Sequence, residues 1–422
     1  MNMHVNIPFP TTEGLVMPAI VDFPAVVQEA LARFGDLFAN EPERRHFGEY
    51  LTGLIVADRK NVSAISREFA VTTDQSCLNR WLTEVDWDPA ELNRRRLQWM
   101  QEDASTRYSE HGVIAIDNVL IDHDGKMIQD VGWFWDHAQG RHKIAHDYLI
   151  ANYVCTSGKH YPLDFHRFVQ RTACELKQAA FRDHNELFRE LVDWIIEQHI
   201  PGAIVFDSWF THAANLDYIH ARRRSYVGDL KFNRRLIVAG QEIKADAFAA
   251  TIPPSDRKPV TIGEHKQWYF TKTVKIPDLD HKVRIVILWK ERSSESPSKI
   301  LVSNEIQWDV TRILRVYKHR WTGTECFHRD GKQHLGMGDC QLRKAEGQTR
   351  HLYLVFTAYS ALMRQMEQGR ARAWALERLT TIGQACRAVL KQTLVRTIQW
   401  IIEQVQDVGL SFQQIKVRLA LG

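Results

Sequence analysis

The alternation of apolar and polar positions changes character near residue 111. Before that point apolar residues recur every three or four positions, most clearly over Phe23–Phe38 and Phe47–Leu54, which is the spacing of amphipathic helices. Residues 61–82 predict two short helices joined by a turn, with helix-turn-helix dimensions. Such a pair either reads DNA or only packs within a helical domain. We expect residues 1–110 to form a helical region that binds DNA.

Short apolar runs typical of strands begin at residue 111 and alternate with helical periods. Residues 111–225 read as several strands, a helix, a strand and a helix, which predicts the first part of an α/β core. Residues 226–303 hold strand-like pieces separated by turn clusters, so we expect a β-rich insertion there. Helical spacing returns over 304–365, the second part of the core, and continues through a helical C-terminal region, 366–422.

The composition is that of a globular protein. Of the 422 residues, 44% are hydrophobic and 25% are charged, which argues against a disordered or collagen-like chain. No apolar run is long enough for a transmembrane helix, and the N-terminus lacks the pattern of a secretory signal. The six cysteines form no CxxC pair, as in proteins with reduced thiols. We therefore expect a cytoplasmic protein that does not enter a membrane.

Positive charge is concentrated locally, although the net charge is only +4. Residues 220–235 hold six basic residues against one acid and include the consecutive Arg222, Arg223 and Arg224. A second basic stretch lies at 364–396. Such clusters indicate a polyanionic partner such as DNA, or else a solvated surface. Glycine-rich phosphate loops are absent from the sequence, so we expect no nucleotide cofactor.

Two aspartates close apolar strand-like runs: Asp117 ends VIAID, and Asp207 ends AIVFD. A carboxylate at the end of a buried strand is costly unless it faces a functional crevice, although strand-end aspartates also serve as turn residues. Glu325, on a helical stretch, supplies a third acid. Three such oxygen ligands suit a pair of magnesium ions, which activates water or a 3′-hydroxyl for attack on a phosphodiester. The rival acids nearby are Asp122, Asp124, Asp130 and Asp217.

Basic and aromatic residues surround Glu325. Tyr317 and Arg320 precede it, and Lys332 follows seven positions later, on the same helical face. Arginine and lysine make charge-assisted contacts to phosphate, and tyrosine can donate a hydrogen bond to it. The pattern predicts a groove with an acid for metal and bases for phosphate. The alternative is an exposed helix with ordinary surface charges.

These residues together resemble the bacterial insertion-sequence transposases of the DDE class, in the cut-and-paste group that carries the YREK signature. That signature is a tyrosine, two residues, an arginine, three residues, a glutamate, six residues and a lysine. The corresponding residues here are Tyr317, Arg320, Glu325 and Lys332. Four residues rather than three separate Arg320 from Glu325, and Gly323 is among them, so we expect a local loop or bulge.

The resemblance implies a fold and a metal site. The fold would be a ribonuclease H-like α/β core with a β-rich insertion, flanked by the helical N- and C-terminal regions. Asp117, Asp207 and Glu325 would be the catalytic triad. They would bind two Mg²⁺ ions, for which Mn²⁺ can substitute.

The resemblance also implies contacts to DNA. Tyr317, Arg320 and Lys332 would grip phosphates. In some related transposases a tryptophan of the insertion supports a flipped base at a hairpin end. Trp268 is the first candidate for that role here, and Trp289 is the second.

The implied activity is magnesium-dependent endonuclease cleavage at the 3′ ends of a mobile element, followed by transesterification into target DNA. The protein would act as a homodimer on double-stranded DNA in the cytoplasm, associated with the bacterial nucleoid. Two alternatives stay open. One is a domesticated or inactive relative that only binds DNA, and the other is a ribonuclease H-like nuclease without strand transfer.

Overall fold

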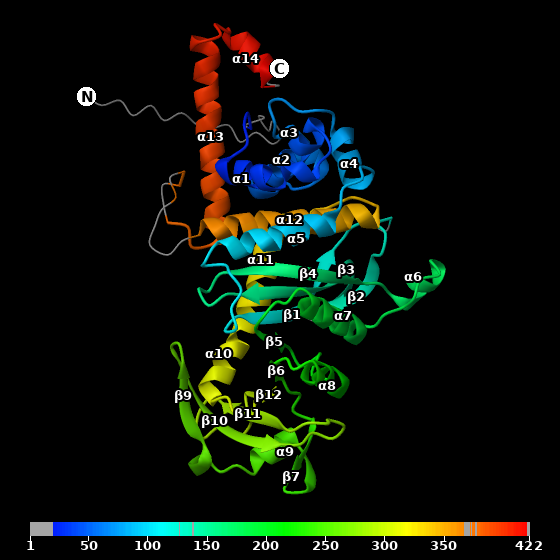
Figure 1. Ribbon diagram of the computed structural model, residues 1–422, viewed down its shortest axis with the longest axis vertical. Helices are drawn as coiled ribbons and strands as arrows, with labels where there is room; N and C mark the ends of the chain where they lie inside the picture. Colours follow the sequence, from blue (N-terminus) through cyan, green and yellow to red (C-terminus); the bar gives the residue numbers. More distant parts are fainter. Residues whose placement is uncertain are drawn as a thin grey trace, which may run out of the picture. The chain divides into compact units, whose positions relative to one another are not determined.

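The computed structural model divides the chain into two compact units, Asp88–Met366 and the combination of Met1–Trp87 with Glu367–Gly422 (Figure 1). Among the residues that it describes, no helix is long and apolar enough to cross a membrane. The described residues are 20–125, 127–136, 139–366, 372, 374–375 and 378–419.

The helical unit is built from both ends of the chain. Its helices are α1 (Ala25–Phe34), α2 (Glu41–Val56), α3 (Val62–Arg67), α4 (Gln75–Thr83), α13 (Ile382–Gln406) and α14 (Phe412–Arg418), with a 3₁₀ turn at Gly35–Leu37. Phe38 anchors an aromatic core against Phe47 and Trp81. Two short helices, α3 and α4, lie in the segment with helix-turn-helix spacing. The side chain of Asp74 caps α4 by accepting a hydrogen bond from the backbone N–H of Ser76.

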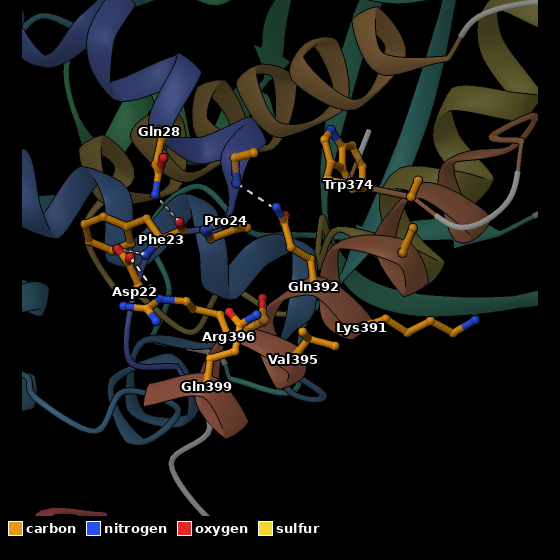
Figure 2. Close-up of a pocket in the computed structure, with 14 residues that line it drawn as sticks. Asp22, Phe23, Pro24, Gln28, Trp374, Lys391, Gln392, Val395, Arg396 and Gln399 are labelled. Atoms are coloured by element: carbon orange, nitrogen blue, oxygen red, sulfur yellow. Dashed lines mark hydrogen bonds and ion pairs between the residues drawn. The ribbon is translucent and has the colours of Figure 1, made fainter. Parts of the chain in front are cut away.

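Helix α13 packs beside the segment that leads into α1. Gln392 Oε1 accepts a hydrogen bond from the backbone N–H of Ala25 at 3.3 Å, and Arg396 Nε lies 3.6 Å from the carboxylate of Asp22. Figure 2 shows these side chains in the wall of a pocket of about 380 Å³. The contacts join residues from the two ends of the chain within one unit.

The second unit is centred on a ten-stranded sheet, which confirms the expected α/β class. The strands are β1 (Val113–Asp122), β2 (Gly132–Asp136), β3 (Arg141–Val154), β4 (His160–Phe168), β5 (Ala203–Phe206), β6 (Tyr226–Asp229), β9 (Lys258–Ile262), β10 (His265–Val274), β11 (Val283–Trp289) and β12 (Lys299–Ser303). Their order is β2-β3-β1-β5-β6-β12-β11-β10-β9, with β4 also paired to β3. The pairs β1–β5 and β5–β6 are parallel and the others are antiparallel.

The segment with β-rich character, residues 226–303, contributes strands to this same sheet. Strands β12, β11, β10 and β9 extend it beyond β6. The remaining two, β7 (Arg235–Val238) and β8 (Gln241–Lys244), form a separate hairpin. The antiparallel half of the sheet is therefore hydrogen-bonded directly to the parallel half.

Helices cover both faces of the sheet. They are α5 (Pro89–Glu102), α6 (Arg171–Leu176), α7 (His184–Glu197), α8 (Ala213–Ala221), α9 (Ala245–Ala250), α10 (Val310–Trp321), α11 (Phe327–His334) and α12 (Ala345–Gln365). Phe188 of α7 packs on Phe206 with their ring centroids 5.4 Å apart. On the opposite face Phe327 of α11 packs against Phe356 of the buried helix α12. Helix α5 lies in this unit, beside α12, and not with the helices that precede it in sequence.

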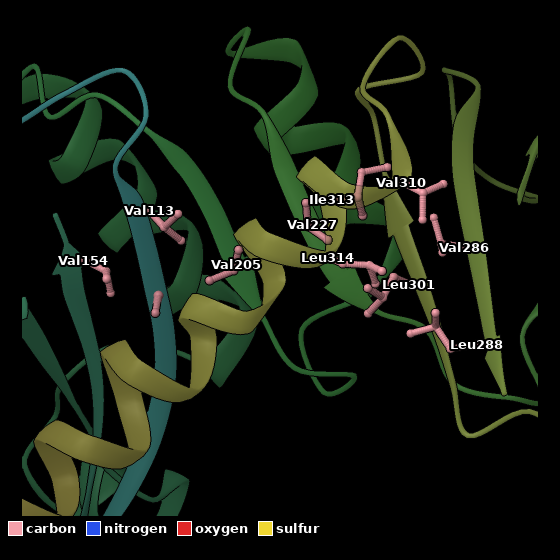
Figure 3. Close-up of a cluster of buried hydrophobic side chains, with 11 residues drawn as sticks. Val113, Val154, Val205, Val227, Val286, Leu288, Leu301, Val310, Ile313 and Leu314 are labelled. Atoms are coloured by element: carbon pink, nitrogen blue, oxygen red, sulfur yellow. The ribbon is translucent and has the colours of Figure 1, made fainter. Parts of the chain in front are cut away.

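A cluster of buried aliphatic residues anchors α10 to the sheet (Figure 3). Ile313 and Leu314 of α10 meet Val205 and Val227 of the parallel strands and Leu301 of β12. Burying each such side chain contributes roughly 1.5–3 kcal/mol. The helix is thereby held across the strands that carry the candidate acids.

Candidate active site

Three aspartates form a row across the parallel strands. The pairing of these strands first sets an apolar row beneath α10, made of Ala115, Val205 and Val227. Side chains alternate along a strand, so the residues two positions further on lie on the same face. Continuing the register by two residues brings Asp117, Asp207 and Asp229 side by side. Neighbouring strands are about 4.8 Å apart, which makes this a compact group of negative charge.

The helix above the row contains a π-helical turn, Thr322–Cys326, between α10 and α11. Within it Gly323 lies against the sheet: a Cβ there would be 2.7 Å from the Cβ of Ala115 and 3.1 Å from Cγ2 of Val154. Only glycine permits so close an approach. Glu325 follows on the exposed side of the turn. The extra residue between Arg320 and Glu325 therefore forms a bulge inside a continuous helix, with no intervening loop.

Arg320 joins this helix to the acid row. Its Nη1 donates to Oδ2 of Asp117 at 2.7 Å, and both side chains are largely buried. Burial and then the neighbouring charge of Asp207 raise the pKa of Asp117 to about 7, although Arg320 opposes the shift. Burial also raises the pKa of Asp207. The row thus holds more negative charge than Arg320 compensates, which is the electrostatic character of a cation-binding or catalytic site.

Asp229 is a site acid that the sequence analysis missed. Lys299 Nζ donates to its carboxylate at 2.8 Å and lies 5.2 Å from the ring centroid of Tyr317. The guanidinium of Arg320 is 6.0 Å from the same ring. The available signal was the run SYVGD, a third apolar segment that ends in aspartate, inside the basic stretch.

The donor set suits a divalent cation chemically. Carboxylate oxygens are the ligands that Mg²⁺ prefers, and Asp117 and Asp207 are buried acids with raised pKa values. Over the described part of the chain, however, no three His, Cys, Asp or Glu side chains converge closely enough to hold a metal ion. Arg320 supplies the positive charge beside Asp117 instead. A bound cation would take over that role from Arg320.

The basic residues that were expected to contact phosphate have different surroundings in the structure. Lys332 Nζ donates to the backbone carbonyl of Leu120 at 2.7 Å, at the far end of β1 from the apolar row. Arg222 pairs with Asp193 at 2.6 Å, and Arg224 donates to backbone carbonyls of the protein. Arg223 is exposed. Of the three consecutive arginines, two are therefore engaged in internal contacts.

The two candidate tryptophans lie opposite each other in the pairing of β10 with β11. Trp289 is fully buried, so its ring is not accessible to a base in this structure. Trp268 is half-buried, with Lys266 Nζ 5.6 Å and Arg292 Cζ 5.2 Å from its ring centroid. Of the two, Trp268 is the one whose ring is partly accessible.

The rival acids lie elsewhere, mostly in ion pairs. Asp122 pairs with Lys143 at 2.6 Å, and Asp217 pairs with His281 at 2.9 Å. Asp130 lies 3.1 Å from Arg167 and also contacts Lys177. Asp124 is exposed after the end of β1. None of these four belongs to the row formed by the parallel strands.

Comparison with known proteins gives one family. The model of the family described as DDE superfamily endonuclease matches residues 33–284, more than half of the chain. No curated protein matches the chain. The matched region contains all three aspartates of the row, and Glu325 lies beyond its end.

Proposed function

The chain belongs to the DDE superfamily endonuclease family, and from this premise we propose that it is a DNA transposase of the insertion-sequence, cut-and-paste group. It would bind the ends of its mobile element, cleave them and join them to target DNA. The observation that carries the proposal is the juxtaposition of Asp117 and Asp207 under the helix that bears Arg320 and Glu325. The three acids Asp117, Asp207 and Glu325 are the proposed catalytic triad.

The strand arrangement supports a ribonuclease H-like core. Strands β4, β3 and β1 form an antiparallel meander, and β5 and β6 add to it in parallel through helical crossovers. The proposed metal-binding aspartates would then lie on the first strand and directly after the fourth strand of that core, next to each other.

The π turn supports the assignment of Tyr317, Arg320, Glu325 and Lys332 to the YREK signature. In a π turn, residues five apart occupy the relation that residues four apart have in an α-helix. Arg320 and Glu325 can therefore face the same groove despite the additional residue between them. We propose that this chain carries the signature with one inserted residue that the helix absorbs.

Asp117, Asp207 and Glu325 would hold two Mg²⁺ ions, or Mn²⁺ in their place. The ions supply activation of a water or 3′-hydroxyl nucleophile and stabilise charge on the attacked phosphate. The chain's own contribution is positioning. Arg320, once a cation replaces it beside Asp117, is free to donate two parallel hydrogen bonds to a phosphate. Lys332 would give a further phosphate contact.

Trp268 and Arg223 are the remaining proposed DNA contacts. Trp268, on strand β10, has part of its ring exposed, and two cations, Lys266 and Arg292, lie near that ring. A base stacked on it would gain from both its π face and the nearby positive charge. Arg223, at the end of α8, is exposed and would contact the backbone of the duplex. Arg222 and Arg224 would act by holding this segment in place.

Helix α13 is the basis for the proposed homodimer. Its buried face includes the polar residues Thr393 and Thr397, whereas its solvent face is aliphatic. A second copy of the helix would cover that face. The exposed aliphatic residues are Leu390, Leu394, Val395, Ile398, Ile402 and Val405.

The length of α13 suits such a contact. The 25-residue helix is about 37 Å long, enough for several turns of contact. A dimer would hold two element ends together, as cutting and joining in one event require.

The function is tested with DNA from both flanks of the native gene, purified protein and Mg²⁺. The variants are Asp207→Asn and, as a matched control, Asp217→Asn, whose carboxylate pairs with His281 away from the row. We expect discrete cleavage and joined products with wild type and with the control, and neither with Asp207→Asn. Cleavage without joining would establish the nuclease alternative, and specific binding without cutting would establish the DNA-binding relative.

A further inference from the structure

A cleft of about 450 Å³ opens beside the acid row. It is lined by residues of the turn after β5, of the loop after β6 and of the strand β7. Its lining includes Ser208, Trp209, Lys231, Arg234 and Arg235, with Asp278 as an acid on its wall. The volume lies within the range of pockets that hold an organic ligand.

The cleft and the acid row belong to the same two chain segments. Trp209 follows Asp207 by two residues, and Lys231 follows Asp229 by two residues. Two residues of extended chain span at most about 7 Å. A strand whose phosphate lies at the acid row would therefore reach the cleft within one or two nucleotides.

Trp209 is an exposed aromatic ring on a well-defined turn. It is 57% exposed. Its backbone N–H donates to Oδ1 of Asp207 at 2.9 Å, and the hydroxyl of Thr211 donates to the carbonyl of Ser208 at 2.9 Å. Arg234 closes the turn by donating to the carbonyl of Thr211. An indole held in position with most of its face in water is a surface prepared for a stacking partner.

The charge around Trp209 selects an anionic partner. Lys231 Nζ is 5.8 Å from the indole centroid. Among the described residues Lys231 has no ion-pair partner within 4.0 Å, whereas Arg235 is paired with Glu242. Lys231 is therefore a cation of the cleft whose charge is available to a ligand, whereas Arg234 is held by the carbonyl of Thr211. An aromatic face with an adjacent cation fits a nucleobase and its phosphate.

We propose that this cleft binds an unpaired nucleotide of the DNA strand next to the cleavage site, with its base on Trp209 and its phosphate at Lys231. The inference rests on the proposed function for the identity of the strand as substrate DNA. Within a duplex, stacking on Trp209 requires the base to leave the stack, because its neighbours cover both of its faces. The cleft would therefore recognise distortion or an open end of the DNA at the acid row.

The test measures binding without cleavage. The full chain, in EDTA, is titrated with a duplex that carries a short single-stranded tail with 2-aminopurine, and with the same duplex fully paired. We expect Trp209→Ala to weaken binding of the tailed DNA about tenfold and to abolish quenching of the 2-aminopurine, with binding of the paired duplex unchanged. Trp209→Phe keeps an aromatic face and should restore most of the affinity and the quenching.

Two further variants separate the cleft from general effects. Trp133→Ala removes another exposed tryptophan, 59% exposed on β2, and should change neither measurement. Lys231→Gln should reduce the salt dependence of tail binding by about one phosphate contact. The proposal is wrong if Trp209→Ala leaves tail binding and quenching unchanged, or if it weakens both DNAs equally.

This readout is independent of catalysis. The protein could bind the tailed DNA through Trp209 and yet cleave no DNA. That result would support the proposed nucleotide-binding cleft and contradict the proposed transposase activity. The protein could instead cleave and join DNA while Trp209→Ala leaves binding of the tailed DNA unchanged. That result would support the transposase activity and contradict the nucleotide-binding cleft.

Discussion

Arg320, near the end of α10, donates to Asp117 of β1 at 2.7 Å, just before the π turn that carries Glu325. The pair couples the helix of Glu325 to the strand of the first candidate metal ligand. A cation would have to bind at the same place, because the negative charges of Asp207 and Glu325 both destabilise the ionised form of Asp117. The contact therefore links folding, metal binding and phosphate binding in one place.

In the metal-free protein, ionisation of Asp117 lowers the free energy of unfolding as the pH rises, and Asp117→Asn should remove this effect. The folded-state pKa of Asp117 is about 7, above its ordinary value near 3.8, so the folded state binds more protons between these values. The contribution of this group to stability therefore falls as pH rises from about 4 to 7. We expect the stability of wild type in EDTA to fall relative to that of the variant by about 2–4 kcal/mol between pH 5 and pH 8.

The control for this effect is Asp130→Asn. Burial alone would raise the pKa of Asp130, but Lys177 and Arg167 lower it below its ordinary value. Its contribution to stability is present above that value and is lost in acid, so Asp130→Asn should destabilise at pH 8. Denaturant titrations at both pH values measure the two signs, and equal behaviour of the two variants would contradict the assignment.

Arg320→Ala should make the stability of the protein depend on divalent metal. Removing one partner of a largely buried pair leaves Asp117 uncompensated and costs about 3 kcal/mol. Mg²⁺ would replace the missing charge, so its addition should raise the Tm of the variant more than that of wild type. Arg315→Ala, an exposed arginine on the same helix, should show the wild-type response. An equal Mg²⁺ response in all three proteins would argue against a cation at Asp117.

Gly323→Ala should separate the helix from the sheet. The new methyl group would lie 2.7 Å from the Cβ of Ala115, so the turn that positions Arg320 and Glu325 must shift. Overpacking of this kind costs about 1–3 kcal/mol, and DNA cleavage should fall more steeply than stability. Gly338→Ala is the matched control, because a methyl group there would meet only Ile121 at 3.9 Å. Thermal melts and the cleavage assay together distinguish a displaced site from an unfolded one.

Deletion of Thr322 should be tolerated. Removing one residue from the π turn lets the helix continue as a regular α-helix, with Arg320 and Glu325 four positions apart and on the same face. We expect a folded protein that retains cleavage, checked by circular dichroism and the assay with native flanking DNA. Inserting an alanine at the same place instead rotates Glu325 by about 100° and should abolish cleavage. Loss of activity in both variants would mean that the π turn itself is required.

Ile398→Glu should disrupt the proposed dimer, since it places a charge in the centre of the aliphatic face of α13. Sedimentation or light scattering with and without DNA measures the outcome, and Gln399→Glu beside it serves as the control. A monomer in every case, including wild type on DNA, would exclude this interface.

The individual helices and strands of this protein could largely be predicted from its sequence. The period of its apolar residues predicted helices near α3, α4 and α7, and a strand that ends near Asp207. These elements depend on side chains close together in the chain, so local spacing is sufficient. The prediction that a strand also ends at Asp117 was wrong, because β1 continues to Asp122 and Asp117 lies within it. The extra residue before Glu325 predicted a local loop or bulge, and the structure has a bulge there.

Which of these features lie next to each other depends on long-range contacts between strands and helices. The register of three strands far apart in sequence sets Asp117, Asp207 and Asp229 level, and nothing local to SYVGD reveals that neighbourhood. The inward contacts of Arg222 and Arg224 depend on Asp193 and on the carbonyls after α7, so a basic run could not be divided into structural and exposed arginines. The difference in burial between Trp268 and Trp289 has the same origin, since neighbouring strands and helices determine which face of a strand is covered.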